Sequence, residues 1–229
     1  MCGRYTITEE IEVLQGRFEF ENAHIDFKPR YNVAPGQNAL VVVKSDSRYL
    51  YMMSWGFVPF WAKDESIGYK LINARGETLS EKPIFKRLFE EKRCLVLADG
   101  FFEWKQLGKG KVKVPMRFVL KDRRPFAFAG LWDIWQDPQG KEQQTFTIIT
   151  TGANEIVRPI HDRMPVILKR EDEEEWLDPE NKKIDRLSSL LKPFPSELMD
   201  VYAVSTIVNS TKNDRPECIR EFGGQPIIF

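Results

Sequence analysis

Short strand-like segments, separated by turn residues, run through most of this chain and limit its fold more than any other feature. They cover residues 39–45, 48–55, 93–106, 114–121, 125–132, 144–151, 164–169 and 200–208. Helical periodicity is confined to 11–18, 77–92, 170–177 and 183–191. Because strands and helices do not alternate strictly, the pattern predicts an α+β fold with a strongly bent, mainly antiparallel, barrel-like β core and peripheral helices.

Local signals sharpen parts of this prediction. Ile11, Leu14 and Phe18 share one face of a short helix, and Thr8 is the candidate cap ahead of it. Pro83 is expected in the first turn of the 77–92 helix, where its missing N–H does no harm. Residues 107–113, "LGKGKVK", are expected to form a hairpin loop, and Trp55 is expected in the core.

No repeat, low-complexity tract or linker divides the 229 residues, which predicts a single domain over 1–229. The 34 basic residues are balanced by 34 acidic ones. This balance argues against coating of nucleic acid or anionic membrane by bulk attraction, so a polyanion would need a local patch. No segment approaches the roughly 20 apolar residues of a membrane span, and the first twenty residues lack the apolar core of a signal peptide.

Cysteine and histidine are scarce. Cys2, Cys94 and Cys218 are odd in number and have no C-x-x-C spacing, which predicts a reducing, cytoplasmic setting without disulfides. With only two histidines in the chain, a zinc site of the usual kind is hard to assemble, so we expect no metal and no cofactor.

The chain begins "MCGRY", and Cys2 is the first candidate for chemistry. Methionine ahead of a small side chain is removed by methionine aminopeptidase, which would leave cysteine with a free α-amine of pKa near 7.7–8.0. Such an amine condenses with an aldehyde to an imine, and the adjacent thiol then closes a five-membered thiazolidine. The alternative is that Cys2 belongs to a disordered start.

Three further segments carry candidate residues. Glu103, in "GFFEW", lies between large aromatics, where burial would raise its pKa toward general acid/base use; otherwise it is a surface residue of a half-buried strand. His161, in "IHDRMP", could carry protons or be structural. In "LINARGET", Asn73 could orient a reacting group and Arg75 could hold a phosphate, or the segment could simply begin a helix.

Together with these segments, "RYNVAPG" (30–36), "WGFVPFW" (55–61), "ADGFFEW" (98–104), "AGLW" (129–132), "HDRMPVIL" (161–168) and "VN" (208–209) follow one another along the chain. In these motifs the chain closely resembles the SRAP family, the SOS response-associated peptidases, essentially from end to end. The resemblance implies the SRAP fold, and binding to abasic sites in single-stranded DNA with a covalent link through Cys2.

The resemblance also implies residue roles. Asn73 corresponds to the asparagine that holds the amine or ring, Glu103 to the general acid/base, and His161 to the histidine that helps open the sugar. Residues expected at the DNA are Arg4, Pro35, Gly36, Arg75, Trp104 and Arg163. One departure lies ahead of the helix that contains Phe85: some relatives of the family carry a DNA-contacting arginine there, whereas this chain has "EKPIF", with Lys82 as the nearest substitute.

Two other functions are compatible with these residues. In a cysteine-type peptidase, Cys2 would attack a peptide with His161 as base, and Asn73 or Glu103 would orient it. A non-covalent reader of single strands would use the aromatic residues of 55–61 for base stacking. For the abasic-site function we expect a cytoplasmic monomer that associates with the nucleoid when it is bound to damaged DNA.

Overall fold

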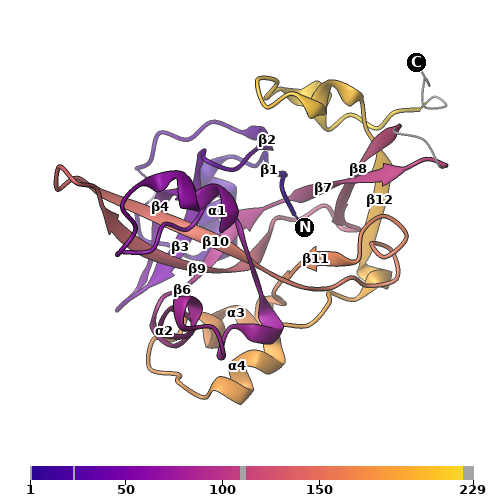
Figure 1. Cartoon of the computed structure of the whole chain (residues 1–229). Helices are drawn as coiled ribbons and strands as arrows, with labels where there is room; N and C mark the ends of the chain where they lie inside the picture. The colour runs from indigo at the N-terminus through magenta and orange to yellow at the C-terminus, as the bar shows by residue number, and fades with distance from the viewer. Residues whose placement is uncertain (1, 23, 109–111, 224–229) are drawn as a thin grey trace.

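The computed structural model describes residues 2–22, 24–108 and 112–223 (Figure 1). Its centre is a closed five-stranded barrel. The barrel strands are Asn38–Lys44 (β3), Arg48–Trp55 (β4), Arg93–Ala98 (β6), Phe126–Gln136 (β9) and Glu142–Gly152 (β10). They pair in the order β10-β4-β3-β6-β9 and back to β10, with every pairing antiparallel except β4–β10. The predicted barrel-like, mainly antiparallel core is therefore confirmed.

A second sheet lies beside the barrel. Its strands, in spatial order, are Met199–Ala203 (β12), Lys113–Leu120 (β8), Gly100–Gln106 (β7), Tyr5–Ile7 (β1) and Arg30–Val33 (β2). The predicted single run 93–106 thus divides into β6 and β7, which belong to different sheets. Asp99 stands at the division, where its N–H donates to the carbonyl of Thr6 at 2.9 Å. Of the loop that joins β7 to β8, residues 109–111 lie outside the described residues.

Helices and short elements surround these sheets. The helices are Ile11–Phe18 (α1), Pro83–Glu91 (α2), Arg170–Leu177 (α3) and Ile184–Leu190 (α4), and the last three gather at one end of the molecule near β6 (Figure 1). Two short strands, Asn73–Arg75 (β5) and Arg163–Pro165 (β11), both pair with β10. The 3-10 turns are Glu65–Lys70 (η1), Gly76–Thr78 (η2), Ser196–Leu198 (η3), Thr206–Asn209 (η4) and Pro216–Cys218 (η5). No helix among the described residues is long and apolar enough to cross a bilayer.

Several local predictions are confirmed and some are wrong. Pro83 occupies the first turn of α2, but this helix begins there and not at residue 77, because residues 76–78 form η2. Thr8 does not cap α1: the helix begins after Glu10, and the Thr8 hydroxyl donates to Asp99 at 2.7 Å. The predicted strands 164–169 and 200–208 end early, at Pro165 and Ala203.

Aromatic side chains fill the space between the barrel and the second sheet. Trp55 is 1% exposed, as predicted, and its ring stacks on Phe146 with centroids 6.4 Å apart. Tyr5 of β1 meets the edges of Trp55 and Phe128, at 5.1 and 5.7 Å. Burial of these large rings supplies much of the hydrophobic stabilisation and fixes β1 against the barrel.

Arg93 ties the helical end of the molecule to the barrel. This side chain is 4% exposed, and its hydrogen bonds to the described residues all go to backbone carbonyls. The acceptors are Phe89, Glu90, Trp176, Asp178 and Asn181. These carbonyls lie around the ends of α2 and α3, where a helix has no backbone donors left to satisfy them.

Replacing Arg93 with methionine is expected to lower the free energy of unfolding by about 3 kcal/mol, because it leaves several buried carbonyls without a donor. Urea denaturation measures this loss. Arg186→Met is the matched control: that arginine is 52% exposed and pairs with Glu175 at 2.6 Å, so the loss of stability should be much smaller than in Arg93→Met. Equal losses in the two variants would show that Arg93 does not support the helix ends.

Candidate active site

The first described residue, Cys2, belongs to the main core. Its side chain is fully buried, and its Sγ lies 3.7 Å from the carbonyl oxygen of Arg4. The Asn73 Nδ2 donates to the carbonyl oxygen of Cys2 at 2.8 Å. A disordered start is thus contradicted, because both the side chain and the backbone carbonyl of Cys2 have fixed surroundings.

A buried polar group behind β1 explains why the start of the chain is fixed. Asp99 accepts hydrogen bonds from Thr6 and Thr8, and it pairs with Arg117 at 2.9 Å. Arg117 also donates to the Thr6 hydroxyl at 2.9 Å. Because both charged side chains are under 10% exposed and are paired with each other, they stabilise one position of β1 relative to β7 and β8.

Asn73 reaches Cys2 from β5, a short strand that runs parallel to β10 with Asn73 opposite Ile148. Its Nδ2 is used by the Cys2 carbonyl. Its Oδ1 is buried and accepts no hydrogen bond from the residues that the structure describes. A buried acceptor of this kind favours a donor from a bound molecule, such as an amine or a hydroxyl.

Glu103 lies on β7 and is 5% exposed, so the interpretation of it as a surface residue is wrong. Burial raises the pKa of its carboxyl to about 7. Near neutral pH such a group is present in both protonation states, and it can therefore donate a proton in one step and accept one in another. The strand places it near Cys2, whose own ionisation its charge opposes.

Burial, together with the charge of Glu103, raises the pKa of the Cys2 thiol far above its ordinary value. The thiol is therefore neutral at physiological pH. This state is poorly suited to a step that begins with attack by a thiolate. It suits a step in which S–H adds to a carbon that has already been activated by another group.

His161 follows β10 and precedes β11. Its Nδ1 accepts a hydrogen bond from the N–H of Arg163 at 2.9 Å, which places the proton of the neutral ring on Nε2. Burial lowers the pKa of His161, so the neutral ring predominates at pH 7. Asp162 Oδ1 also lies 2.9 Å from Nδ1 and favours the protonated ring, which allows the imidazole to take up a proton transiently.

Two of the arginines expected at the DNA, Arg75 and Arg163, differ in their surroundings. Arg75 is exposed on β5, opposite Thr150 of β10. Arg163 forms a bidentate salt bridge with Glu77, with N–O distances of 2.6 and 2.8 Å, and it also donates a hydrogen bond to the carbonyl of Thr150 at 2.7 Å. Arg75 is therefore open to a phosphate, whereas a phosphate at Arg163 must compete with Glu77. Sequence reasoning missed Glu77, although it lies inside the "INARGET" motif.

Arg4 and Trp104 contact each other, with the guanidinium 5.8 Å from the centre of the indole ring. Arg4 donates to the Asn32 side chain at 2.7 Å, and Trp104 Nε1 donates to the Asn209 side chain at 2.7 Å. Neither asparagine was predicted. The sequence did contain a signal for Asn209, because this residue is the second of the "VN" motif.

Pro35 and Gly36 form the turn between β2 and β3. Gly36 is exposed and has φ +83°, and a Cβ there would lie 3.1 Å from the ring of Tyr69. Only glycine adopts this conformation in so narrow a space. Nearby along the chain, Phe60 and Trp61 are 66% and 58% exposed, so part of the aromatic segment 55–61 lies on the surface.

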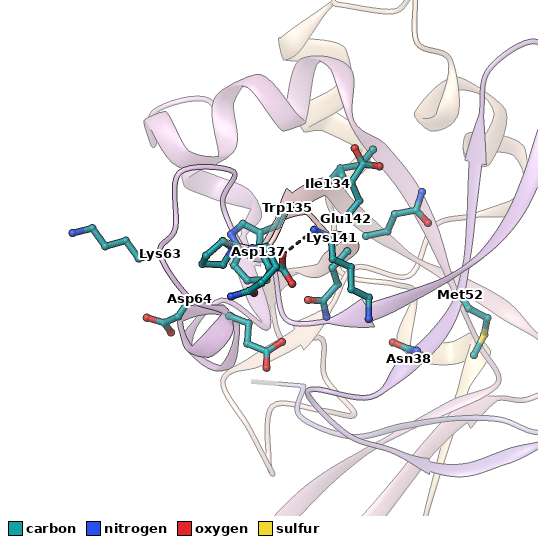
Figure 2. A pocket seen from close by; sticks show the side chains of 14 residues that line it. Asn38, Met52, Lys63, Asp64, Ile134, Trp135, Asp137, Lys141 and Glu142 are labelled. Atoms are coloured by element: carbon teal, nitrogen blue, oxygen red, sulfur yellow. Dashed lines mark hydrogen bonds between the residues drawn. The ribbon is translucent and has the colours of Figure 1, made fainter.

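A hollow of about 850 Å³ lies elsewhere, between the loop at Lys63–Glu65 and the far end of the β9–β10 hairpin (Figure 2). It is lined mainly by polar side chains, and its acidic residues outnumber its two lysines, Lys63 and Lys141. None of the predicted site residues lines it. We therefore assign the candidate site to the residues around Cys2. Among the described residues, no three His, Cys, Asp or Glu side chains gather as metal ligands would.

A family model described as SOS response associated peptidase (SRAP) matches residues 1–211. The chain belongs to the SRAP family. Abasic site processing protein YoqW of Bacillus subtilis is 50% identical over 222 residues, covering 96% of this chain and 99% of YoqW. Abasic site processing protein HMCES of Gallus gallus is 35% identical over 224 residues, covering 84% of this chain and 66% of HMCES.

The fold of this SRAP chain is also found in a crystal structure of a protein from Bacteroides thetaiotaomicron. The two superpose with a TM-score of 0.87 at 31% identity, over 96% of this chain and all of the other. The predicted resemblance to the SRAP family and the predicted SRAP fold are both confirmed.

Proposed function

We propose that this protein recognises abasic sites in single-stranded DNA and links to them covalently through the α-amine and thiol of Cys2. One observation carries the proposal: a buried Cys2, held by Asn73, lies near a carboxyl group whose pKa is about 7. The names of the relatives, abasic site processing proteins, support DNA with a missing base as the substrate. Removal of Met1, which lies outside the described residues, has to precede the reaction.

The proposed reaction has two bond-forming steps. The Cys2 amine adds to the aldehyde carbon of the opened sugar, and the resulting carbinolamine loses water to give an imine. The Cys2 sulfur then bonds to the imine carbon while its proton passes to the nitrogen, which closes a thiazolidine. Overall, one water molecule is lost and nothing is oxidised or reduced. Because burial keeps the Cys2 thiol neutral, the sulfur itself carries the proton that passes to the nitrogen in this last step.

Each neighbouring side chain has a distinct proposed role. Glu103 donates the proton that converts the carbinolamine hydroxyl into leaving water, and it accepts a proton in the reverse direction. His161, neutral with its proton on Nε2, assists the opening of the sugar. Asn73 holds the Cys2 backbone with Nδ2 and offers the buried Oδ1 to the amine or to a sugar hydroxyl.

The surrounding residues are proposed to hold the strand rather than to react. The proposed phosphate contacts are Arg75 and Arg163, with Arg4 in support, and Trp104 offers a face for base stacking. The turn at Pro35 and Gly36 is proposed to press against neighbouring bases. Because the net charge is zero, these local contacts must supply the attraction to DNA.

A cysteine peptidase is the second candidate, favoured by the family's printed description. It would need Cys2 as a thiolate, with His161 accepting the proton. The strongly raised pKa of the buried thiol and the lowered pKa of His161 both weigh against this ion pair. We therefore place the covalent link to DNA first.

Two preparations test the proposal: one that begins at Cys2, and one with an extra residue ahead of it that turns the amine into an amide. Each is incubated with single-stranded DNA carrying one abasic site and is examined by denaturing gel and intact mass. We expect a heat-stable adduct, at the summed mass less one water, only when the amine is free. An absence of adduct in both preparations would overturn the proposal, and purely reversible binding in both would support the non-covalent reader instead.

A further inference from the structure

Residues 204–218 are fastened to β2 by buried polar contacts, and we call this segment the clasp. Asn32 is fully buried, and the two N–H groups of its Nδ2 are shared among the carbonyls of Val208, Ser210 and Asn213, which lie at 2.7–3.1 Å. Asp214 accepts hydrogen bonds from two backbone N–H groups of β2. The end of the clasp lies beyond residue 211, where the family match stops.

The clasp also packs on the strand that carries Glu103. Val204, Val208 and Cys218 of the clasp are all buried and form a small hydrophobic cluster with Phe102 of β7. Trp104 packs against the same cluster. The two residues that flank Glu103 on β7 therefore both contact the clasp.

Polar contacts extend from the clasp to the residues expected at the DNA. Asn209 Oδ1 accepts a hydrogen bond from Trp104 Nε1 at 2.7 Å. Arg4 donates to the carbonyls of Val208 and Asn209, at 2.8 and 3.4 Å. The carbonyl of Arg4 in turn lies against the Cys2 thiol. One segment at the far end of the chain thus holds both Trp104 and the beginning of β1.

We propose that the clasp holds the indole of Trp104 in a position where a DNA base can stack on it. Asn209 is the positioning residue, because its side chain fixes the plane of that indole. A half-exposed indole can rotate about its side-chain bonds, and a single hydrogen bond at Nε1 selects one orientation of its face. Stacking on a base depends on that orientation. The ligand is the nucleobase next to an abasic position, so this inference rests on the proposed function.

Three variants test the positioning role: Asn209→Leu, which keeps the size but removes the acceptor; Trp104→Phe, which keeps an aromatic face but removes the donor; and the double variant. The control is Thr211→Val, an exposed position in the same clasp. The probe is single-stranded DNA with a tetrahydrofuran residue, a stable abasic analogue that has no aldehyde. We measure its equilibrium binding, and the rate of adduct formation with true abasic DNA against DNA concentration.

Asn209→Leu is expected to raise two quantities about fivefold: the dissociation constant for the analogue and the half-saturating concentration of abasic DNA. The maximal rate of adduct formation and the melting temperature should change less. In the Trp104→Phe background the same change should have no further effect. A merely structural role would lower the melting temperature and leave the half-saturating concentration unchanged, and unchanged binding in Asn209→Leu would overturn the inference. If the wild type forms no adduct but the variants bind the analogue as expected, the proposed covalent function is wrong and the positioning role of Asn209 is still supported.

Discussion

Glu103→Gln is expected to slow adduct formation about 100-fold and to change its dependence on pH. The amide has the shape of the carboxyl but cannot donate or accept a proton at neutral pH. In the wild type, the unprotonated amine increases toward pH 8, while the protonated carboxyl of Glu103 decreases above its pKa of about 7. The rate should therefore have a maximum between these values, and the variant should lose the decline at high pH.

The same variant should be more stable than the wild type in alkaline solution. Burial raises the pKa of Glu103 from 4.5 to about 7, so the folded protein binds its proton more tightly than the unfolded chain does. The stability that comes from the neutral carboxyl is complete below pH 4.5 and is lost as the pH rises through 7. A shift of this size corresponds to roughly 3 kcal/mol. Urea denaturation at pH 4 and pH 8 should show a gain for Glu103→Gln only at the higher pH.

Glu142→Gln is the matched control, since Glu142 is an exposed glutamate at the start of β10. It should alter neither the adduct rate nor the pH dependence of stability. If Glu103→Gln reacted at the wild-type rate, Glu103 would not be the proton carrier. If it gained no stability at pH 8, the carboxylate would not be destabilised by burial.

The strand pattern predicted the fold class because alternation of apolar residues is a local property. Closure of the barrel is not local. It depends on β10 pairing with β9 on one side and with β4 on the other, and the second pairing is parallel and spans about ninety residues. The break at Asp99 was missed for the same reason, because the groups that hold it, Thr6 and Arg117, come from distant strands.

In the candidate site, too, some features follow from the local sequence and others depend on long-range contacts. Cys2 and Glu103 could be predicted because their chemistry follows from residue type and from apolar neighbours. The contact between Asn73 and the Cys2 carbonyl, and the pair formed by Arg163 with Glu77, depend on how β5 and β11 lie against β10. Such contacts decide which arginine is open to DNA, and only the structure supplies them.

Cys2→Ser is expected to abolish the heat-stable adduct, with a loss of at least about 100-fold, while leaving the first bond-forming step in place. Serine retains the α-amine, so the imine still forms, but its hydroxyl is a far weaker nucleophile toward the imine carbon. The side chain of Cys2 is fully buried, and serine fits the same space, so folding should be little affected. Methionine is also removed ahead of serine, and intact mass verifies that the amine is free.

Borohydride reduction separates the two steps, because it converts an imine into a stable amine link. Wild type should give an adduct without reductant, whereas Cys2→Ser should give one only when borohydride is present. An extra residue placed ahead of the serine is the matched control, and it should remove the trapped adduct as well. If Cys2→Ser gave as much heat-stable adduct as the wild type, the sulfur would not be part of the link. If borohydride trapped nothing, the amine would not be the group that attacks, and Asn73 and Glu103 would have to act on the thiol alone.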